Sequence, residues 1–181
     1  MKYDLRFLSV QLSCHLGMNK RTEIADLRLR VAANVDSEAV ARLVNDAFRL
    51  ERLIFTTEDR TNPEEVRSMM SNGEFLLVED GAALVGCVYL EPRGERCYLG
   101  LLSVEPVRRR SGLGTWLMTI AEDHCRAAGA RGVDIQIVNL RKELPDYYHR
   151  LGYVETGTAP FPAHVKISQP CHFIKMSKEL S

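Results

Sequence analysis

Residues 97–114 read CYLGLLSVEPVRRRSGLG, and the two halves of this stretch differ in physical character. The first half, residues 97–104, is almost continuously apolar, which is typical of a strand covered on both faces of a sheet. The second half is a turn with three consecutive arginines and two glycines, Gly112 and Gly114. Apolar residues then recur every three or four positions until Gly129, which predicts an amphipathic helix with a glycine stop. A strand that passes through a glycine turn into a helix is therefore predicted at the centre of the fold.

This turn has the features of an anion site. The first turn of a helix has unpaired N–H groups and the positive end of the helix dipole, and glycines let a phosphate approach the backbone closely. Arg108, Arg109 and Arg110 add positive charge. The spacing matches neither a dinucleotide GxGxxG nor a P-loop, since no GK[ST] follows. Spacing alone leaves a solvated basic turn as the alternative.

The rest of the chain predicts one α/β domain, a mixed sheet of about seven strands with about four helices packed on both faces. Residues 1–26 show no clear pattern and are assigned to an N-terminal extension, and residues 27–181 to the domain. Asp80-Gly81 predicts a hairpin, and 92–94 a second turn. The other predicted strands are 27–31, 75–79, 84–90, 133–138, 153–158 and 171–176, and the other helices run from Asp36 or Ser37 to Phe48, from Asn62 to Gly73 and from Pro145 to Gly152.

Composition excludes several classes of function. The 181 residues carry 24 Lys+Arg against 24 Asp+Glu, so the net charge argues for neither a nucleic-acid partner nor an anionic membrane. No apolar run approaches the roughly 18 residues that span a bilayer, and the N-terminus lacks the order of a signal peptide. The five cysteines are scattered without a CxxC pair. We therefore expect reduced thiols in a cytoplasmic protein.

Two motifs resemble the GNAT superfamily, the Gcn5-related N-acetyltransferases. Leu102-Ser103-Val104-Glu105-Pro106 followed by Arg109-x-x-Gly112-x-Gly114 is similar to the family's strand ending in Val-x-Pro and its [QR]xxGx[GA] turn. Residues 147–153, YYHRLGY, resemble its C-terminal helix motif, in which Tyr148 matches the conserved tyrosine. The resemblance extends over about residues 27–178.

The resemblance implies acetyl-CoA as the acyl donor, with no metal. Tyr148 would act as the general acid toward the departing thiolate, where a well-placed donor is effective. The pantetheine arm would lie in a gap beside strand 97–104, paired with its backbone as an added strand. Asn139, at the end of strand 133–138, matches an asparagine that contacts this arm, although its spacing to Tyr148 is longer than usual. The implied cofactor-binding residues are Leu102, Ser103, Val104, Arg109, Arg110, Ser111, Gly112, Leu113, Gly114, Thr115 and Asn139.

The sequence indicates the acceptor of the acetyl group less clearly than the donor. The resemblance implies direct attack by an amine, and a small-molecule amine is the leading hypothesis; a protein N-terminus or lysine, and a non-catalytic acyl-CoA sensor, remain alternatives. Specificity is expected in residues 50–60, which include Arg52, Arg60 and the Glu58-Asp59 pair, and in the loop 159–170. Homodimers are common in the family, and the sequence leaves a homodimer open. The candidate general bases are Glu51, Glu91, Glu105, His164 and His172, and a chain of water molecules is an equal alternative.

Overall fold

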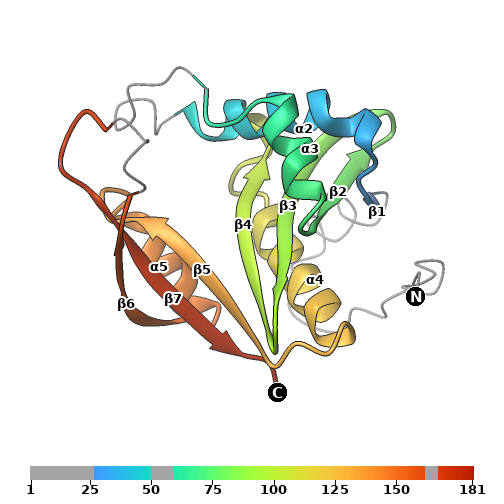
Figure 1. Cartoon of the computed structure of the whole chain (residues 1–181). Helices are drawn as coiled ribbons and strands as arrows, with labels where there is room; N and C mark the ends of the chain where they lie inside the picture. The colour runs from blue at the N-terminus through green and yellow to red at the C-terminus, as the bar shows by residue number, and fades with distance from the viewer. Residues whose placement is uncertain (1–26, 50–58, 162–166) are drawn as a thin grey trace.

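The computed structural model describes residues 27–49, 59–161 and 167–181 and confirms the predicted fold class. Seven strands form one mixed sheet in the order β1-β2-β3-β4-β5-β7-β6, and helices cover both of its faces (Figure 1). Neighbouring strands are antiparallel except β4 and β5. The strands are β1 (Arg28–Val31), β2 (Glu74–Asp80), β3 (Ala83–Arg93), β4 (Arg96–Val104), β5 (Gly132–Val138), β6 (Val154–Pro160) and β7 (His172–Glu179). The helices are α2 (Ser37–Ala47), α3 (Pro63–Met70), α4 (Leu113–Ala127) and α5 (Glu143–Arg150), with short 3-10 turns η2 (Asn34–Asp36) and η4 (Pro106–Arg108).

Strand β2 shows how the sheet separates two cores. Successive side chains of a strand point to opposite faces. Phe75 and Leu77 therefore pack with α2 and α3, whereas Leu76 and Val78 pack with α4 on the other face. All four side chains are fully buried. The sheet is thus apolar on both faces at its centre, and helices are needed on both sides.

Strands β4 and β5 separate after a short pairing. Their parallel register joins only residues 96–98 to residues 132–134, although both strands continue beyond it. The β3–β4 register slips between Cys87 and Tyr89, and Leu101 of β4 has a φ of 48°. An extra residue of this kind is a β-bulge, which bends its strand and breaks the local pairing. Figure 1 shows β4 and β5 diverging from a common lower end.

Three local predictions need correction. The second turn is displaced from 92–94 to Gly94 and Glu95, because β3 continues to Arg93. Pro92 lies beyond the last β2–β3 pair, Glu74 with Leu90, so β2 requires no N–H from it. Helix α5 begins at Glu143, and Pro145 occupies its first turn, where N–H groups have no helical partner. Asp36 precedes α2 but makes no side-chain cap. Its carboxylate instead accepts hydrogen bonds from Arg30 and from the Ala33 N–H.

Candidate active site

The turn between β4 and α4 contains several backbone N–H groups without an acceptor in the described part of the chain. Arg110 and Gly112 both have positive φ, 64° and 95°, so the chain reverses sharply before the helix. The Leu113 N–H donates to Ser111 Oγ at 3.2 Å. In the part of the chain that the structure describes, the N–H groups of Gly112, Gly114 and Thr115 have no acceptor. This arrangement fits a bound phosphate or diphosphate, since unpaired amides and the helix dipole act together there.

The three arginines of this turn do not act as one cluster. Arg108 pairs with Asp80 and with Glu105, so the expectation that it adds charge at the same place is wrong. Arg109 donates to the Ala47 carbonyl at 2.5 Å, at the C-terminal end of α2. Arg109 and Arg110 both line a cavity beside the turn. Two of the three arginines of the turn therefore border the cavity, which Arg60 and Arg141 also line.

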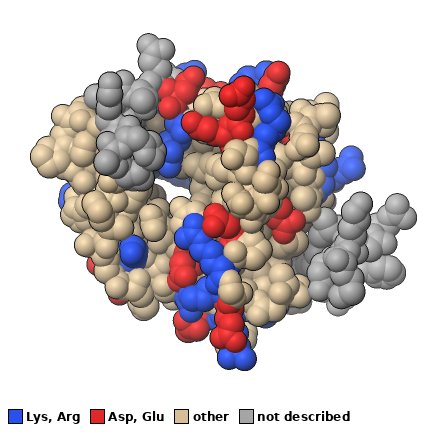
Figure 2. Space-filling view, in the orientation of Figure 1, with Lys and Arg blue, Asp and Glu red and all other residues tan. Residues whose placement is uncertain are grey.

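The cavity occupies the gap between β4 and β5 and has a volume of about 530 Å³. In the view of Figure 2 the surface is hollowed near the middle of this face, between groups of acidic and basic side chains. Leu102 and Val104 line one wall, and Tyr148 of α5 lines the opposite side. The cavity thus connects the turn before α4 with the predicted catalytic tyrosine.

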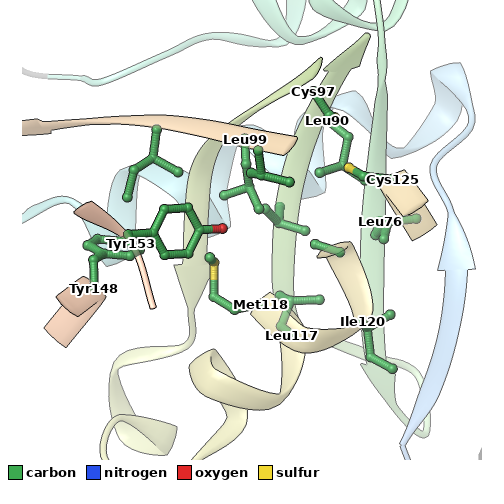
Figure 3. Close-up of a cluster of buried hydrophobic side chains, with 14 of the residues drawn as sticks. Leu76, Leu90, Cys97, Leu99, Leu117, Met118, Ile120, Cys125, Tyr148 and Tyr153 are labelled. Carbon is green, nitrogen blue, oxygen red and sulfur yellow. The ribbon is translucent and has the colours of Figure 1, made fainter. Parts of the chain in front are cut away.

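Tyr148 is held in an aromatic row. Its side chain is buried, with 7% exposed. Its ring packs edge-on against Tyr147, with centroids 5.0 Å apart, and against Tyr153, with centroids 5.7 Å apart. Figure 3 shows Tyr148 beside Tyr153 at the border of the core. The neighbouring Tyr147 lines the same cavity, and its hydroxyl lies 3.4 Å from Thr115 Oγ1.

Several predicted site residues lie beside the cavity without lining it. Ser103 is fully buried and donates to the Leu101 carbonyl at 2.9 Å. Leu113 packs in the core, and Ser111 caps the turn. The Asn139 Oδ1 accepts the His172 N–H at 2.9 Å, which prolongs the pairing of β5 with β7. Gly112, Gly114 and Thr115 are not among the lining residues either, and cofactor binding by every residue named for it stays a prediction.

The candidate bases are dispersed. Glu91 pairs with Arg93, and Glu105 pairs with Arg108. His172 begins β7 and is exposed, and none of the three lines the cavity. Glu51 and His164 lie outside the described residues, as do Arg52 and Glu58.

Sequence reasoning missed several polar residues of the cavity wall, namely Thr61, Glu65, Tyr98, Gln136 and Arg141. Glu65 is the one carboxylate among the described residues that line it, and its Oε2 accepts the Thr61 hydroxyl at 3.0 Å. Asn62 caps α3 through the Glu64 and Glu65 N–H groups, which sets Glu65 in the first helical turn. Tyr98 of β4 also lines the cavity, and burial raises the pKa of its phenol. The Asn62-Pro63 helix start was the available signal for Glu65, but it does not tell which way the helix faces.

Two further observations bear on the class of site. Among residues 27–49, 59–161 and 167–181, no three His, Cys, Asp or Glu side chains are arranged to hold a metal ion. Within the same ranges, no helix is long and apolar enough to cross a bilayer.

Comparison with known proteins identifies the family of this chain. The family model for the acetyltransferase (GNAT) domain matches residues 44–180. The chain belongs to the GNAT family. The GNAT fold accounts for the separated β4 and β5 strands and for the glycine turn before α4, as the resemblance of the two motifs predicted.

Similar proteins agree with this assignment. The chain is 32% identical over 99 residues to a protein named "Probable N-acetyltransferase 14" of Xenopus tropicalis, a match that covers 52% of this chain and 48% of that protein. The chain therefore spans about half the length of this curated relative.

Solved GNAT structures share the fold at low sequence identity. A ribosomal-protein-alanine N-acetyltransferase of Brucella melitensis is 20% identical with a TM-score of 0.69, over 84% of this chain and 99% of that one. Ard1 of Thermoplasma volcanium is 16% identical with a TM-score of 0.70, over 86% and 99%. The structure of yncA from Salmonella typhimurium, solved with its cofactor acetyl-CoA, is 18% identical with a TM-score of 0.67, over 86% and 95%.

Proposed function

We propose that this protein transfers an acetyl group from acetyl-CoA to a primary amine of a small molecule. One observation carries the proposal: a single cavity extends from Arg109 and Arg110, in the turn before α4, to the buried Tyr148. The family assignment supports it. We further propose that the protein acts in the cytoplasm, where the four cysteines among the described residues, all of them free thiols, would stay reduced.

The turn before α4 fits the diphosphate of coenzyme A. Gly112 adopts the left-handed backbone that the turn requires, and the N–H groups of Gly112, Gly114 and Thr115 have no acceptor in the described part of the chain. Arg110 adds a positive charge at the same edge of the cavity. When bound there, acetyl-CoA supplies a thioester, which an amine can cleave without a covalent enzyme intermediate.

The gap between β4 and β5 suits the pantetheine arm. Because β4 leaves its partner after Tyr98, the backbone groups of Leu102 and Val104 can pair with an extended amide-containing chain. A backbone N–H of this stretch can also stabilise the negative oxygen that forms when the amine nitrogen attacks the carbonyl carbon. The carbon–sulfur bond then breaks, and Tyr148 donates its phenolic proton to the thiolate.

The acceptor end of the cavity combines apolar walls with one carboxylate. Phe48, Met69 and Tyr98 contribute apolar surface, and Glu65 supplies the carboxylate. An amine reaches the site as an ammonium ion, which a carboxylate binds and whose proton it can accept directly or through water. Arg60 lines the same end, near the Phe48 ring. We propose that Glu65 receives the acceptor amine.

Turnover with a panel of amines tests the function. Release of coenzyme A is measured with a thiol reagent against amino acids, polyamines, aminoglycosides and N-terminal peptides. Tyr148→Phe is expected to lower kcat about 100-fold or more, with the KM for acetyl-CoA within about threefold of wild type.

The matched control is Tyr89→Phe, which also removes a buried phenolic hydroxyl. This hydroxyl donates to the carbonyl of Met69 in α3. It is expected to keep kcat within about threefold. Transfer to peptides alone would show that the small-molecule assignment is wrong. Binding of acetyl-CoA without turnover on any amine would instead identify a sensor.

A further inference from the structure

One stripe of helix α4 contacts both ends of the tyrosine row. Thr115 and Glu122 are seven residues apart, which is two helical turns, so their side chains share a face about 10 Å apart along the axis. Thr115 Oγ1 lies 3.4 Å from the Tyr147 hydroxyl. Glu122 Oε1 accepts the Tyr153 hydroxyl at 3.0 Å. The row Tyr147–Tyr148–Tyr153 is therefore held at both ends by the helix whose N-terminus forms the proposed diphosphate site.

Tyr148 occupies the middle of this row. Its ring lies edge-to-face with both neighbours, at interplanar angles of 74° and 76°. Aromatic pairs prefer this geometry, so each neighbour favours one ring orientation. Backbone contacts reinforce it: Gly152, with a φ of 90°, turns the chain back after α5, and the Tyr153 N–H donates to the Tyr148 carbonyl at 3.1 Å. Movement of Tyr153 is thus transmitted to Tyr148 through its ring and its backbone.

Glu122 is a fixed attachment point. Its side chain is 9% exposed, and Lys178 Nζ of β7 lies 2.6 Å from its Oε2. The same Lys178 nitrogen lies 5.7 Å from the centre of the Tyr153 ring. A buried carboxylate with two hydrogen-bond partners is costly to displace, because either partner would be left unpaired. Burial and the Glu122 charge raise the pKa of Tyr153, so its hydroxyl stays a neutral donor.

We propose that Glu122 and Tyr153 are positioning residues that hold the Tyr148 hydroxyl toward the thioester sulfur. This inference rests on the proposed function, in which Tyr148 is the acid. It gives α4 two tasks: its N-terminus binds the diphosphate, and its Glu122 face sets the orientation of the acid. Acid catalysis needs the donor within hydrogen-bond reach of the leaving group, so a small tilt of Tyr148 reduces turnover.

A double-mutant cycle separates positioning from general destabilisation. Tyr153→Phe keeps the ring and removes only the hydroxyl that Glu122 accepts. It is expected to lower kcat about three- to tenfold, the size of one lost hydrogen bond, with the KM for acetyl-CoA unchanged. In a Tyr148→Phe background the same change is expected to have no further effect on kcat, because the acid that it positions is absent.

Two controls are matched to this change: one removes a buried tyrosine hydroxyl outside the row, and the other changes Glu122 but keeps an oxygen that can accept from Tyr153. Tyr89→Phe removes a buried hydroxyl outside the row and is expected to keep kcat. Glu122→Gln retains an acceptor oxygen for Tyr153 and is expected to keep more activity than Glu122→Ala. An unchanged kcat in Tyr153→Phe, or an equal loss with and without Tyr148, would overturn the inference.

A second readout does not require turnover. In protein labelled with carbon-13 at the tyrosine Cζ, the Tyr148 signal is identified by its loss in Tyr148→Phe. Tyr153→Phe is expected to shift or broaden this signal, whereas Tyr89→Phe leaves it in place. If no amine is acetylated but the Tyr148 signal responds in this way, the proposed function fails and the structural linkage stands. If the signal does not respond, the linkage itself is wrong.

Discussion

The two glycines of the turn before α4 should respond to alanine in opposite directions. Gly112 has a φ of 95°, and an alanine in left-handed backbone costs about 1–2 kcal/mol. Gly114 is the second residue of α4, and a Cβ there would lie 3.6 Å from the Tyr147 hydroxyl and 3.8 Å from Val104 Cγ2, which are ordinary contacts. Alanine at 114 should therefore stabilise the helix by about 0.5–1 kcal/mol.

Thermal unfolding without ligand measures both changes. At about 2–4 °C per kcal/mol for a chain of this size, Gly112→Ala should lower Tm by about 2–8 °C and Gly114→Ala should raise it by about 1–4 °C. Acetyl-CoA is then added, because a ligand that binds only the folded state raises Tm. Gly112→Ala should lose much of this rise, since its backbone amide and those of Gly114 and Thr115 would shift. Gly114→Ala should keep it, because the family pattern [QR]xxGx[GA] accepts alanine at this position.

Gly81→Ala is the matched control. Gly81 has a φ of 59° in the turn between β2 and β3, and a Cβ there would meet no atom within 4 Å. It should lose a comparable amount of stability while keeping the full rise in Tm with acetyl-CoA. The reasoning is refuted if Gly112→Ala and Gly114→Ala shift Tm in the same direction, or if Gly81→Ala and Gly112→Ala weaken the ligand-induced rise equally.

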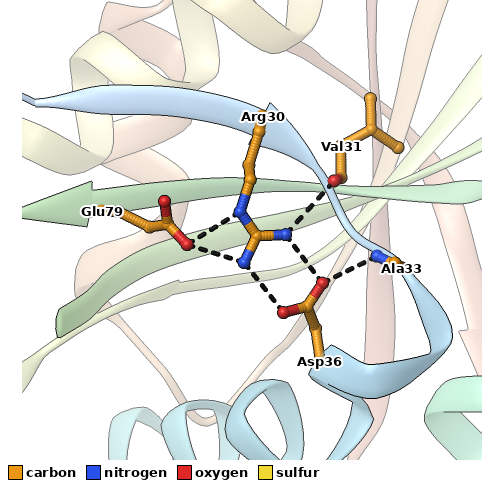
Figure 4. Close-up of polar contacts among 5 residues, drawn as sticks. All are labelled: Arg30, Val31, Ala33, Asp36 and Glu79. Carbon is orange, nitrogen blue, oxygen red and sulfur yellow. Dashed lines mark hydrogen bonds and ion pairs between the residues drawn. The ribbon is translucent and has the colours of Figure 1, made fainter. Parts of the chain in front are cut away.

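Three further predictions concern pH, an ion-pair network and the acceptor. A carboxylate on β2 raises the pKa of His124 above 6.5, so this ion pair stabilises the fold fully below pH 6.5 and the stabilisation is lost as the pH rises through the pKa of His124 in the folded state. The free energy of unfolding in urea should therefore be lower at about pH 9 than at about pH 6, and His124→Gln should abolish this difference. Arg30 bridges two carboxylates that are 13% and 15% exposed (Figure 4), so Arg30→Met should lower the unfolding free energy by about 1–3 kcal/mol, less than for a fully buried pair. Arg49→Met, at an exposed pair, should change it by less than about 0.5 kcal/mol, and equal losses would contradict the argument. Glu65→Gln should raise the KM for the amine about tenfold without changing the acetyl-CoA thermal shift, whereas Glu64→Gln should change neither; a loss of acetyl-CoA binding would place Glu65 at the wrong end of the cavity.

Local patterns predicted most of the secondary structure. Asn62 caps α3 and Pro63 is its first residue, as the sequence indicates, because caps depend on neighbours within one turn. The alternation in β2 and the apolar stripe of α4 likewise follow from the periods of a strand and a helix. The incorrect predictions of strand and helix limits occurred where the structure depends on a residue far away in the sequence. Pro92 lies within β3 because β2 begins only opposite Leu90, which no local window around the proline reveals.

The sequence by itself determined the family, the order of strands and helices and the glycine turn before α4, and it proposed Tyr148 as the acid, because each of these depends on residues within a few positions of one another. Only the tertiary structure decided how wide the cavity opens, that Glu65 of α3 lines the same cavity as Tyr148, and that Glu122 holds Tyr153. These contacts join residues about 30 to 80 positions apart. They arise from sheet register, the β4 bulge and the packing of helices on opposite faces, and the energies that select among such arrangements are sums over the whole core rather than properties of any short segment.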